Sequence, residues 1–386
     1  MKLKNFSALK NIQGKRILVR CDFDVPLKNG KIIDDSRLRA CLPTIKFLLK
    51  KSAKVILIGH LGRPQGKFSP ELSLVPVQKH LEKLLKQKIT FIPIERYVGE
   101  AAKKKVRQLK TGQLAMLENL RFSDREELNC RRFAKSLAGL ADIYINEAFA
   151  VSHRAASSVS AIREYLPVYS GLHLDEEIEK LSITLKKPTH PLTLIIGGAK
   201  IETKLPVIKQ FIDKAEHILI GGAVANDFFK GLGYEVGTSL IDEEYIKDAN
   251  TILEKIAHSQ TKLILPLDIK VANGKKAITR EPHAVLSDEM ILDIGPKTTK
   301  LYQDIIRQSK MIIWNGPMGK FEDPRFASGT RLITEGVLKS NAKSLIGGGE
   351  TGEIFKNKKL PQHIFISVGG GAMLDFLAGK KLPGLN

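Results

Sequence analysis

Short, nearly continuous apolar runs recur along this chain, and segments with helical spacing separate most of them. Segments 77–85 and 246–256, for instance, have apolar residues at i, i+3 and i+4. Strands that are apolar on both faces must be covered on both sides, as in parallel sheets between helices. The pattern therefore predicts an α/β fold. The expected strands are Arg16–Arg20, Lys54–Gly59, Ile89–Pro93, Leu114–Leu117, Ile143–Asn146, Leu192–Gly197, His217–Gly221, Leu263–Pro266, Met311–Trp314, Ser344–Gly347 and Ile364–Val368.

The 386-residue chain is longer than one hydrophobic core usually supports, which is about 250–300 residues. Near its middle, Asp175–Lys187 has the stripe of an amphipathic helix, and Pro188 and Pro191 follow it. Proline stops a helix and stiffens the connection. We therefore expect two lobes, each a parallel sheet covered by helices on both faces, joined by a helical hinge. The expected bounds are 1–171 for the first domain, 172–187 for the interdomain helix and 188–370 for the second domain.

Glycines follow the strands of the second half. Ligands of open parallel sheets bind beyond the carboxyl ends of the strands, and glycine lets backbone N–H groups approach phosphate oxygens there. Four such turns in one lobe favour a nucleotide-binding lobe over tight packing alone. The turns are Gly197-Gly198-Ala199-Lys200, Gly221-Gly222-Ala223, Gly347-Gly348-Gly349-Glu350-Thr351 and Gly369-Gly370-Gly371-Ala372.

Two familiar nucleotide-binding classes are not supported. The chain has no GxxxxGK[ST] motif, so it is not predicted to be a P-loop NTPase. Gly347, Gly349 and Gly352 fit the spacing of GxGxxG, but the next strand, Ile364–Val368, ends in glycines rather than in an acidic residue that could hold a ribose. A Rossmann dehydrogenase is therefore disfavoured.

Basic and polar residues follow the strands of the first half. Arginine recognises carboxylate and phosphate groups with two parallel hydrogen bonds. Because the carboxyl ends of parallel strands meet at one edge, these side chains are expected to form a compact site for a small anion. They are Asp22 and Asp24 after the first strand, Arg37 after a turn, His60 and Arg63, Arg121, and Arg154.

The net charge of +21 favours anionic partners, whether nucleic acid, an anionic membrane or small phosphorylated metabolites. Aromatic residues make up only 6% of the chain and no RRM, KH or zinc-finger pattern occurs, so nucleic acid is an unlikely primary partner. The lysines of 79–88 and 103–110 are expected on solvated helix faces.

Three cysteines without CxxC spacing indicate neither a disulfide framework nor a zinc site. With no long apolar run and no signal sequence, a cytoplasmic protein without a membrane partner is expected.

Nine collinear segments resemble the phosphoglycerate kinase family and together cover nearly the whole chain. The resemblance implies a two-lobed, usually monomeric glycolytic enzyme. Its reaction is reversible phosphoryl transfer between 1,3-bisphosphoglycerate with MgADP and 3-phosphoglycerate with MgATP. The segments are RILVRCDFDVPL (16–27), GHLGRP (59–64), ENLRF (118–122), SHRAASS (152–158), GGAKIETK (197–204), LPLDIKVA (265–272), WNGPMGKFE (314–322), GGGET (347–351) and VGGGAMLDFLAGKKLPG (368–384).

The resemblance also implies roles for individual residues, and a C-terminal segment, 371–386, that returns to the first domain. The acid substrate would contact Asp22, Asp24, Arg37, His60, Arg63, Arg121 and Arg154. The nucleotide would contact Lys200, Lys204, Gly221, Gly222, Asn315, Glu322, Gly348, Gly349, Glu350, Thr351, Gly369, Gly370 and Gly371, with Mg²⁺ on Glu350 and the phosphates. The implied catalytic groups are Arg37, Lys200, Lys204 and Gly370.

The chemistry of the implied reaction agrees with these residue roles. The acceptor is a carboxylate, already ionised near neutral pH, so no general base is needed and catalysis reduces to positioning and charge neutralisation after lobe closure.

The chain departs from the usual family pattern at Asp24, Glu147, Ala150, Glu350 and Val368. A carboxylate at Asp24 would either repel an anionic substrate or pair with a neighbouring arginine. A kinase-like scaffold that has lost activity also stays open as an alternative.

Overall fold

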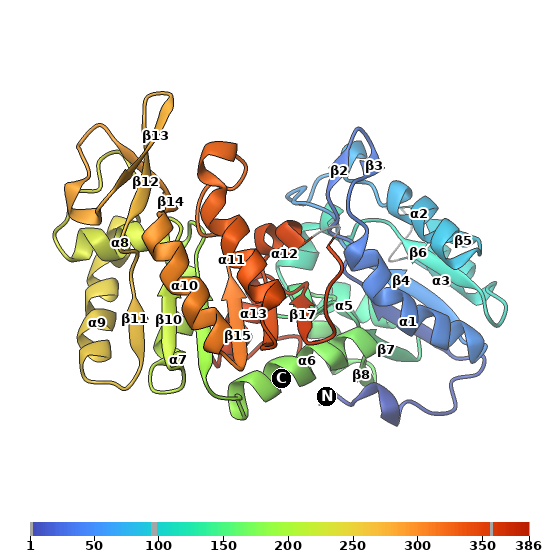
Figure 1. The fold of residues 1–386 in the computed structure, drawn as a ribbon. Coiled ribbons are helices and arrows are strands. Elements are labelled where there is room, and N and C mark those ends of the chain that lie inside the picture. The colour runs from blue at the N-terminus through green and yellow to red at the C-terminus, as the bar shows by residue number, and fades with distance from the viewer. Residues whose placement is uncertain (1–2, 94–98, 356–357, 386) are drawn as a thin grey trace. The chain divides into compact units, whose positions relative to one another are not determined.

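The structure is a computed structural model that describes residues 3–93, 99–355 and 358–385. The chain divides into two compact units (Figure 1). The first unit consists of Met1–Glu179 and Lys381–Asn386, and the second of Lys180–Lys380.

The first unit is built on a 6-stranded sheet in the order β5-β6-β4-β1-β7-β8, with every neighbouring pair parallel. Its strands are β1 (Arg16–Arg20), β4 (Lys54–Ile58), β5 (Ile89–Ile92), β6 (Leu114–Leu117), β7 (Ile143–Asn146) and β8 (Val168–Ser170). A small hairpin, β2 (Leu27–Lys28) with β3 (Lys31–Ile32), projects from it.

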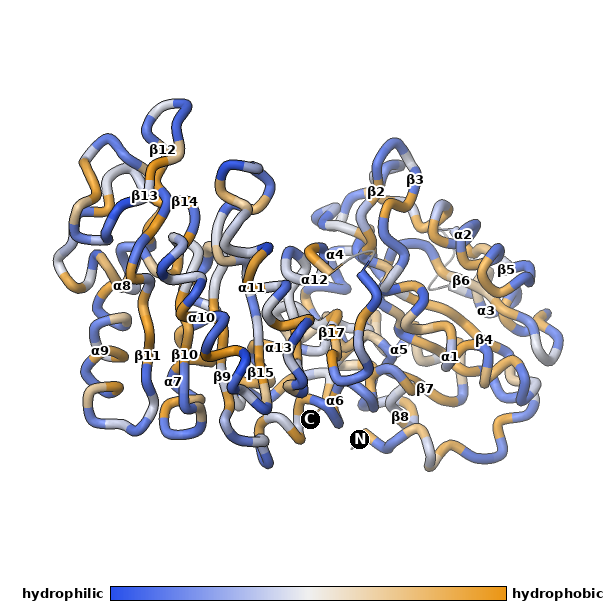
Figure 2. The backbone as a smooth tube through the Cα atoms, in the orientation of Figure 1, coloured by the Kyte–Doolittle hydropathy of each residue, from blue (hydrophilic) through white to orange (hydrophobic). Residues whose placement is uncertain are grey.

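Successive residues of β1 enter two different cores, as the two-residue period of a strand requires. Ile17 and Val19 pack with the apolar sides of α1 (Ser36–Lys50) and α2 (Val75–Leu85). Leu18 packs on the other face with α3 (Glu100–Arg107) and α5 (Arg131–Ala138). The sheet is therefore covered on both faces, and Figure 2 shows its strands as mainly hydrophobic. The short helix α4 (Asp124–Glu127) precedes α5.

The second unit is built on another 6-stranded parallel sheet, in the order β11-β10-β9-β15-β16-β17. Chain order runs outward from β9 in one direction and then resumes from β15 in the other. Between these two strands lies the topological switch point, where open α/β sheets bind ligands. The strands are β9 (Leu192–Ile196), β10 (His217–Ile220), β11 (Lys262–Ile264), β15 (Met311–Asn315), β16 (Lys343–Gly347) and β17 (Ile364–Ser367).

Helices and a smaller antiparallel sheet complete the second unit. Helices α10 (Pro296–Gln308) and α11 (Ser328–Lys339) cover one face of the parallel sheet, where Tyr302 and Ile333 pack against Trp314. The antiparallel sheet, in the order β13-β12-β14, was not expected from the sequence. It is formed by β12 (Ile269–Asn273), β13 (Lys276–Arg280) and β14 (Met290–Ile294). The helices are α7 (Leu205–Phe211), α8 (Val224–Gly231), α9 (Ile246–Ala257), α10 (Pro296–Gln308), α11 (Ser328–Lys339), α12 (Gly349–Phe355) and α13 (Gly371–Leu377).

The predicted fold class is confirmed: two parallel sheets, each flanked by helices. The helix expected over 172–187 is α6 (Leu172–Lys186), and the division between the units falls inside it, after Glu179. Residues 371–380, which the sequence analysis grouped with the returning segment, lie in the second unit, and only Lys381–Asn386 belong to the first. No helix in the described parts of the chain is both long and apolar enough to span a bilayer.

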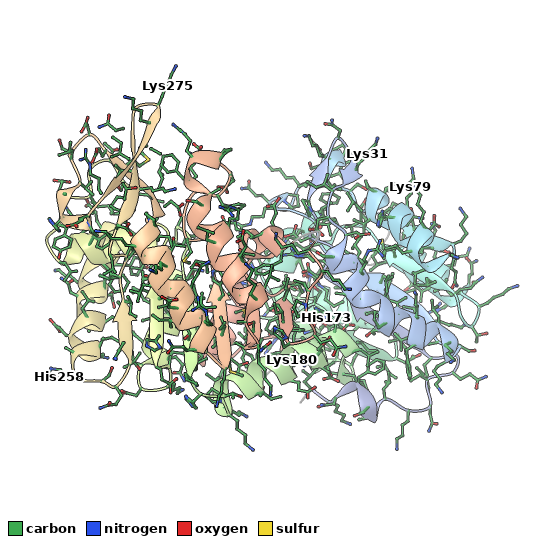
Figure 3. All side chains as sticks on the ribbon, viewed as in Figure 1. Lys31, Lys79, His173, Lys180, His258 and Lys275 are labelled. Carbon is green, nitrogen blue, oxygen red and sulfur yellow. The ribbon has the colours of Figure 1, made fainter. Side chains whose placement is uncertain are left out.

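Many of the excess lysines lie on exposed surfaces. Lys79 on α2 and Lys104 on α3 are exposed, in the two segments where solvated helix faces were expected. Figure 3 shows Lys31, at the β2–β3 hairpin, and Lys275, at the tip of the β12–β13 hairpin, pointing away from the units that carry them. Their charges are therefore available to water and counterions.

The C-terminal residues of the first unit are held by backbone and side-chain hydrogen bonds. The N–H of Gly384 donates to the carbonyl oxygen of Ser152 over 2.8 Å, and Nδ2 of Asn146 donates to that of Gly384 over 3.3 Å. Arg163 donates to the carbonyl oxygen of Pro383 over 2.7 Å, and Leu382 is buried.

Glu147 is a buried carboxyl group at the N-terminus of α6. Its Oε1 accepts from the hydroxyl of Thr44 over 2.5 Å and from the N–H of His173 over 3.2 Å, while Oε2 accepts from the N–H of Leu174 over 3.1 Å. The first N–H groups of a helix have no partner inside it, so this side chain caps α6. Burial raises the pKa of Glu147 to about 8, although these hydrogen bonds oppose the rise.

This pKa predicts how stability depends on pH. A carboxyl that binds its proton more tightly in the folded state stabilises the fold at low pH, and that contribution is lost as the pH rises through the folded pKa. We expect the melting temperature of the wild type to fall from about pH 5 to about pH 8 and that of Glu147→Gln to fall less. Thermal unfolding followed by circular dichroism checks this, with Glu164→Gln, at an exposed position, as the matched control. Parallel curves for wild type and Glu147→Gln would contradict the assignment.

Candidate active site

In the first unit, Asp22 and Asp24 follow β1 and face Arg37 from the first turn of α1. Oδ2 of Asp22 lies 3.4 Å from Nε of Arg37, and Oδ2 of Asp24 lies 3.8 Å from Nη1 of the same side chain. Nη1 also donates to the carbonyl oxygen of Asp24 over 2.7 Å. Burial raises the pKa of Asp22, and the charge of Arg37 opposes that rise.

Asp24 also touches the strand end of β4. Its Oδ1 accepts a hydrogen bond from the N–H of Gly62 over 2.9 Å, and its Oδ2 lies 3.8 Å from Nε2 of His60. Of the two possibilities left open by the sequence, these contacts match the one in which the carboxylate pairs with an arginine.

Three further arginines were expected in the anion site. Arg121 is buried and donates to the carbonyl oxygen of Gly62 over 2.8 Å, while its Nε lies 3.2 Å from Glu127. Arg154 is half-buried and close enough to lower the pKa of both Arg121 and His60. Arg63 is exposed. The side chains of Arg63 and Arg154 make no hydrogen bond or ion pair with any other described residue. Both guanidinium groups are therefore free to receive an anion.

His60 lies among these charges. The ring is buried, and burial together with Arg20, Arg121, Arg154 and Arg37 holds its pKa well below the usual range. The structure thus brings together Asp22, Asp24, Arg37, His60, Arg121 and Arg154, and contacts of Arg63 with this group are not found among the described residues.

In the second unit, backbone segments crowd together at the switch point between β9 and β15. The N–H of Gly198 donates to the carbonyl oxygen of Pro317 over 2.8 Å, and the N–H of Gly222 donates to that of Met318 over 2.9 Å. Gly222 has φ +59°, and a Cβ there would lie 2.5 Å from the nitrogen of Gly198. Glycine is therefore required at Gly222 by both conformation and space.

Lys204 is the buried cation of this region. Its Nζ donates to Oδ1 of Asn315, whose Nδ2 donates to the carbonyl oxygen of Gly347 over 2.7 Å. Burial lowers the pKa of Lys204 to about 8, and the nearby charge of Glu350 opposes this. The buried hydroxyl of Thr351 accepts from the N–H of Gly316 over 2.8 Å. Asn315 and Thr351, expected as nucleotide contacts, thus use these side-chain groups to hold the site together.

A cavity of about 240 Å³ opens beside these turns. Of the residues expected to contact a nucleotide, Gly222, Glu322 and Glu350 line it. Lys204, Asn315 and Thr351 lie in the surrounding hydrogen-bond network rather than in the cavity wall, and Gly221 and Gly348 do not line the cavity either.

The remaining expected residues of the second unit are near chain turns. Lys200, Gly349 and Glu350 are exposed. Gly370 precedes α13 with φ +49° and ψ −111°, a conformation that side chains rarely adopt, and a Cβ there would meet nothing within 4 Å. Gly369 and Gly371 flank it without lining the cavity.

The sequence analysis missed the apolar wall of the cavity. This wall comes from β14, with Met290 and Leu292, from the turn after β15, with Pro317 and Met318, and from Leu240 in the segment between α8 and α9. Leu240 and Met290 are 58% and 38% exposed, so they offer apolar surface to a flat ring. In the sequence these residues are recognisable only as apolar side chains close to a predicted turn. Such residues are too common to identify the wall of a cavity.

No cluster of three or more His, Cys, Asp or Glu side chains suited to a metal ion occurs in residues 3–93, 99–355 and 358–385. Glu350 is an exposed carboxylate on the cavity wall. Mg²⁺ is commonly held by one or two carboxylates with substrate phosphates and water. The residues present therefore fit a magnesium ion that arrives with a nucleotide, rather than one held by protein ligands alone.

Comparison with known proteins agrees with this arrangement. The family model described as phosphoglycerate kinase matches residues 7–380. Phosphoglycerate kinase from Clostridium kluyveri is 41% identical over 385 residues, covering 97% of this chain and 96% of that protein. The enzyme from Dictyoglomus turgidum is 42% identical over 382 residues, with the same coverage of 97% and 96%.

Solved structures are also similar. That of phosphoglycerate kinase from Coxiella burnetii has a TM-score of 0.85 and 38% identity, covering 99% of this chain and 98% of the other. That of the enzyme from Pyrococcus horikoshii has a TM-score of 0.87 and 32% identity, covering 99% and 97%. With two parallel sheets, basic residues at the strand ends of one and glycine turns at those of the other, the chain belongs to the phosphoglycerate kinase family of glycolytic kinases.

Proposed function

We propose that this kinase transfers a phosphoryl group reversibly between 1,3-bisphosphoglycerate with MgADP and 3-phosphoglycerate with MgATP. The first unit binds the acid through Asp22, Asp24, Arg37, His60, Arg63, Arg121 and Arg154. The observation that carries the proposal is the group of arginines around His60, of which Arg154 has no side-chain hydrogen bond or ion pair with any other described residue. Such a group suits a ligand with a carboxylate at one end and a phosphate at the other.

The second unit binds the nucleotide. The apolar cavity wall receives the base, and Glu322 lies at the same wall for the sugar hydroxyls. The turns at Gly221 and Gly222, Gly348 and Gly349, and Gly369 to Gly371 present N–H groups to the phosphates, with Lys200, Lys204, Asn315 and Thr351 beside them. Glu350 and the phosphates would hold Mg²⁺, which would offset phosphate charge.

The acceptor carboxylate needs no general base. The residues proposed for catalysis, Arg37, Lys200, Lys204 and the N–H of Gly370, supply positive charge and donors where negative charge develops. Reacting atoms must approach to about 3–3.5 Å. Because each substrate binds a different unit, we propose that the units close around α6 and exclude water, which limits wasteful hydrolysis of ATP.

A coupled assay of 1,3-bisphosphoglycerate formation from 3-phosphoglycerate and MgATP tests the proposal as a whole. Activity is expected, and its absence from a folded protein that still binds MgADP would favour the inactive scaffold. We further propose that the protein acts as a monomer in the cytoplasm, without a membrane or nucleic-acid partner.

Replacing Lys204 should separate catalysis from binding. A lysine aimed at the transferred phosphoryl stabilises charge mainly in the transition state, so Lys204→Met should lower kcat on the order of 100-fold or more. The dissociation constant for MgADP should change much less. The fluorescence of Trp314, the single tryptophan of the chain and next to Asn315, provides the binding measurement.

Lys209→Met is the matched control, because Lys209 is an exposed lysine that pairs with Asp248 in the same unit. It should leave kcat unchanged. If Lys204→Met behaves like this control, Lys204 has no catalytic role.

Glu350 is expected to set the magnesium requirement. Glu350→Gln removes the charge at constant shape and should raise the Mg²⁺ concentration for half-maximal activity, whereas Glu350→Asp should stay near the wild type. The measurement is a titration of activity with Mg²⁺ at fixed nucleotide. Glu353→Gln, at an exposed position on α12, is the control, and identical titrations of Glu350→Gln and this control would remove Glu350 from the site.

The contacts of Asp24 predict the outcome of removing its charge. An asparagine at this position can still accept from the N–H of Gly62 but no longer pairs with Arg37. Asp24→Asn should therefore leave the KM for 3-phosphoglycerate unchanged or raise it, with little change in kcat. Steady-state kinetics check this, and Asp142→Asn, which removes the partner of Arg16 at the start of β1, is the control. A KM lowered several-fold by Asp24→Asn would show repulsion to dominate instead.

A further inference from the structure

Arg20, the last residue of β1, is almost fully buried at 2% exposure and lies beneath the anion site. Its Nε donates to the hydroxyl of Ser158 over 2.9 Å, and its Nη1 donates to the carbonyl oxygen of Cys21. Its Nη2 lies 2.9 Å from Nδ1 of His60. The hydrogen-bond donors of Arg20 are therefore used within the protein. The side chains of Arg63 and Arg154, by contrast, have donors left for an anion.

The contact between Arg20 and His60 shows which of the two groups donates the hydrogen bond. A guanidinium group has only donors, so Nδ1 of His60 must accept and cannot carry a hydrogen. A neutral imidazole then carries its hydrogen on Nε2, the nitrogen that lies 3.8 Å from Oδ2 of Asp24 in the anion site.

The surroundings also keep the ring uncharged. His60 is faced by Arg20 from β1, Arg37 from α1, Arg121 from the turn after β6, and Arg154. Asp24 is the carboxylate with a contact to the ring, at 3.8 Å. Protonation of Nδ1 would break the hydrogen bond from Arg20 and place two donors against each other.

The position of Arg20 is itself held by a buried acid. Ser158 donates its hydroxyl to Oε1 of Glu126 over 2.5 Å, and its N–H donates to Oε2 over 3.0 Å. The hydroxyl oxygen therefore remains an acceptor for Nε of Arg20. Glu126 is 1% exposed and lies close enough for its charge to interact with Arg20.

We propose that Arg20, held by Ser158 and Glu126, is a positioning residue that keeps His60 as the neutral tautomer with its hydrogen on Nε2, so that the ring acts only as a donor to the acid substrate. The part about the substrate rests on the proposed function. The part about the tautomer does not, because it concerns the protein without ligands.

Nuclear magnetic resonance of the ligand-free full chain tests the tautomer. Long-range ¹H–¹⁵N spectra of protein labelled at histidine distinguish the two ring nitrogens, and His60→Gln identifies the signals of His60. We expect hydrogen on Nε2 and no titration from about pH 5.5 to about pH 8. Hydrogen on Nδ1, or titration of the ring within that range, would overturn the proposal without bearing on the enzyme reaction.

Variants of Arg20 test the cause. In Arg20→Met the ring should populate both tautomers and titrate, whereas Arg20→Lys, which retains a donor, should restore the wild-type signals. Arg163→Met, which removes a buried guanidinium that donates to Pro383 in the same unit, is the control and should leave the signals of His60 unchanged. An unaltered tautomer in a folded Arg20→Met protein would overturn the role of Arg20.

Kinetics test the consequence for the substrate. Arg20→Met should raise the KM for 3-phosphoglycerate several-fold while the KM for MgATP stays the same, and Arg20→Lys should recover most of the loss. Equal changes in both KM values, as expected from general damage, would contradict the positioning role. If the protein has no activity at all, the proposed function fails while the spectra still decide the tautomer.

Discussion

Both candidate sites depend on cations that neutral oxygen atoms orient. Arg37 donates to the carbonyl oxygen of Asp24, Arg121 to that of Gly62, and Lys204 to the amide oxygen of Asn315. A carbonyl or amide orients a cation without cancelling its charge, whereas a carboxylate at the same distance would neutralise it. In a medium of low dielectric constant the remaining field is strong. Arg37 and Arg121 also have carboxylate partners, in Asp22 and Glu127, which supply part of their counter-charge. Lys204 makes no ion pair with a described carboxylate, so an anionic ligand would supply its counter-charge.

Strand ends were the part of the site that the sequence predicted best. Parallel strands bring residues such as Asp22, His60 and Arg121 to one edge, although they are far apart in the chain, so the grouping of these side chains could be inferred from the pattern alone. The individual contacts of these side chains could not be inferred from the sequence. Arg20 has the same residue type and the same strand-end position as its neighbours, and only its burial and its bond to His60 distinguish its role. Likewise, Asn315 was expected to contact a nucleotide, and its side chain holds Lys204.

The apolar wall of the cavity shows why other parts of the candidate site could not be predicted from the sequence. Met290 and Leu292 belong to a strand whose place is set by pairing with β12, and pairing of that kind depends on distant parts of the chain. The strand order of the second unit is that of many dinucleotide-binding domains, yet no acidic residue follows where a ribose would need it. The sheet topology locates a ligand, and the side chains around it decide which ligand is bound.

The path of the chain also constrains the order in which the molecule is made. Lys381–Asn386 belong to the first unit, but they follow all of the second unit in the sequence. On the ribosome, the first unit can form its sheet early, yet the hydrogen bonds of Gly384 to Ser152 and of Arg163 to Pro383 must wait until the whole second unit has been made. Ser152 lies two residues before Arg154. A nascent chain therefore gains this hydrogen bond next to Arg154 only after the second unit has been made, and a product that stops short of Lys381 lacks it altogether.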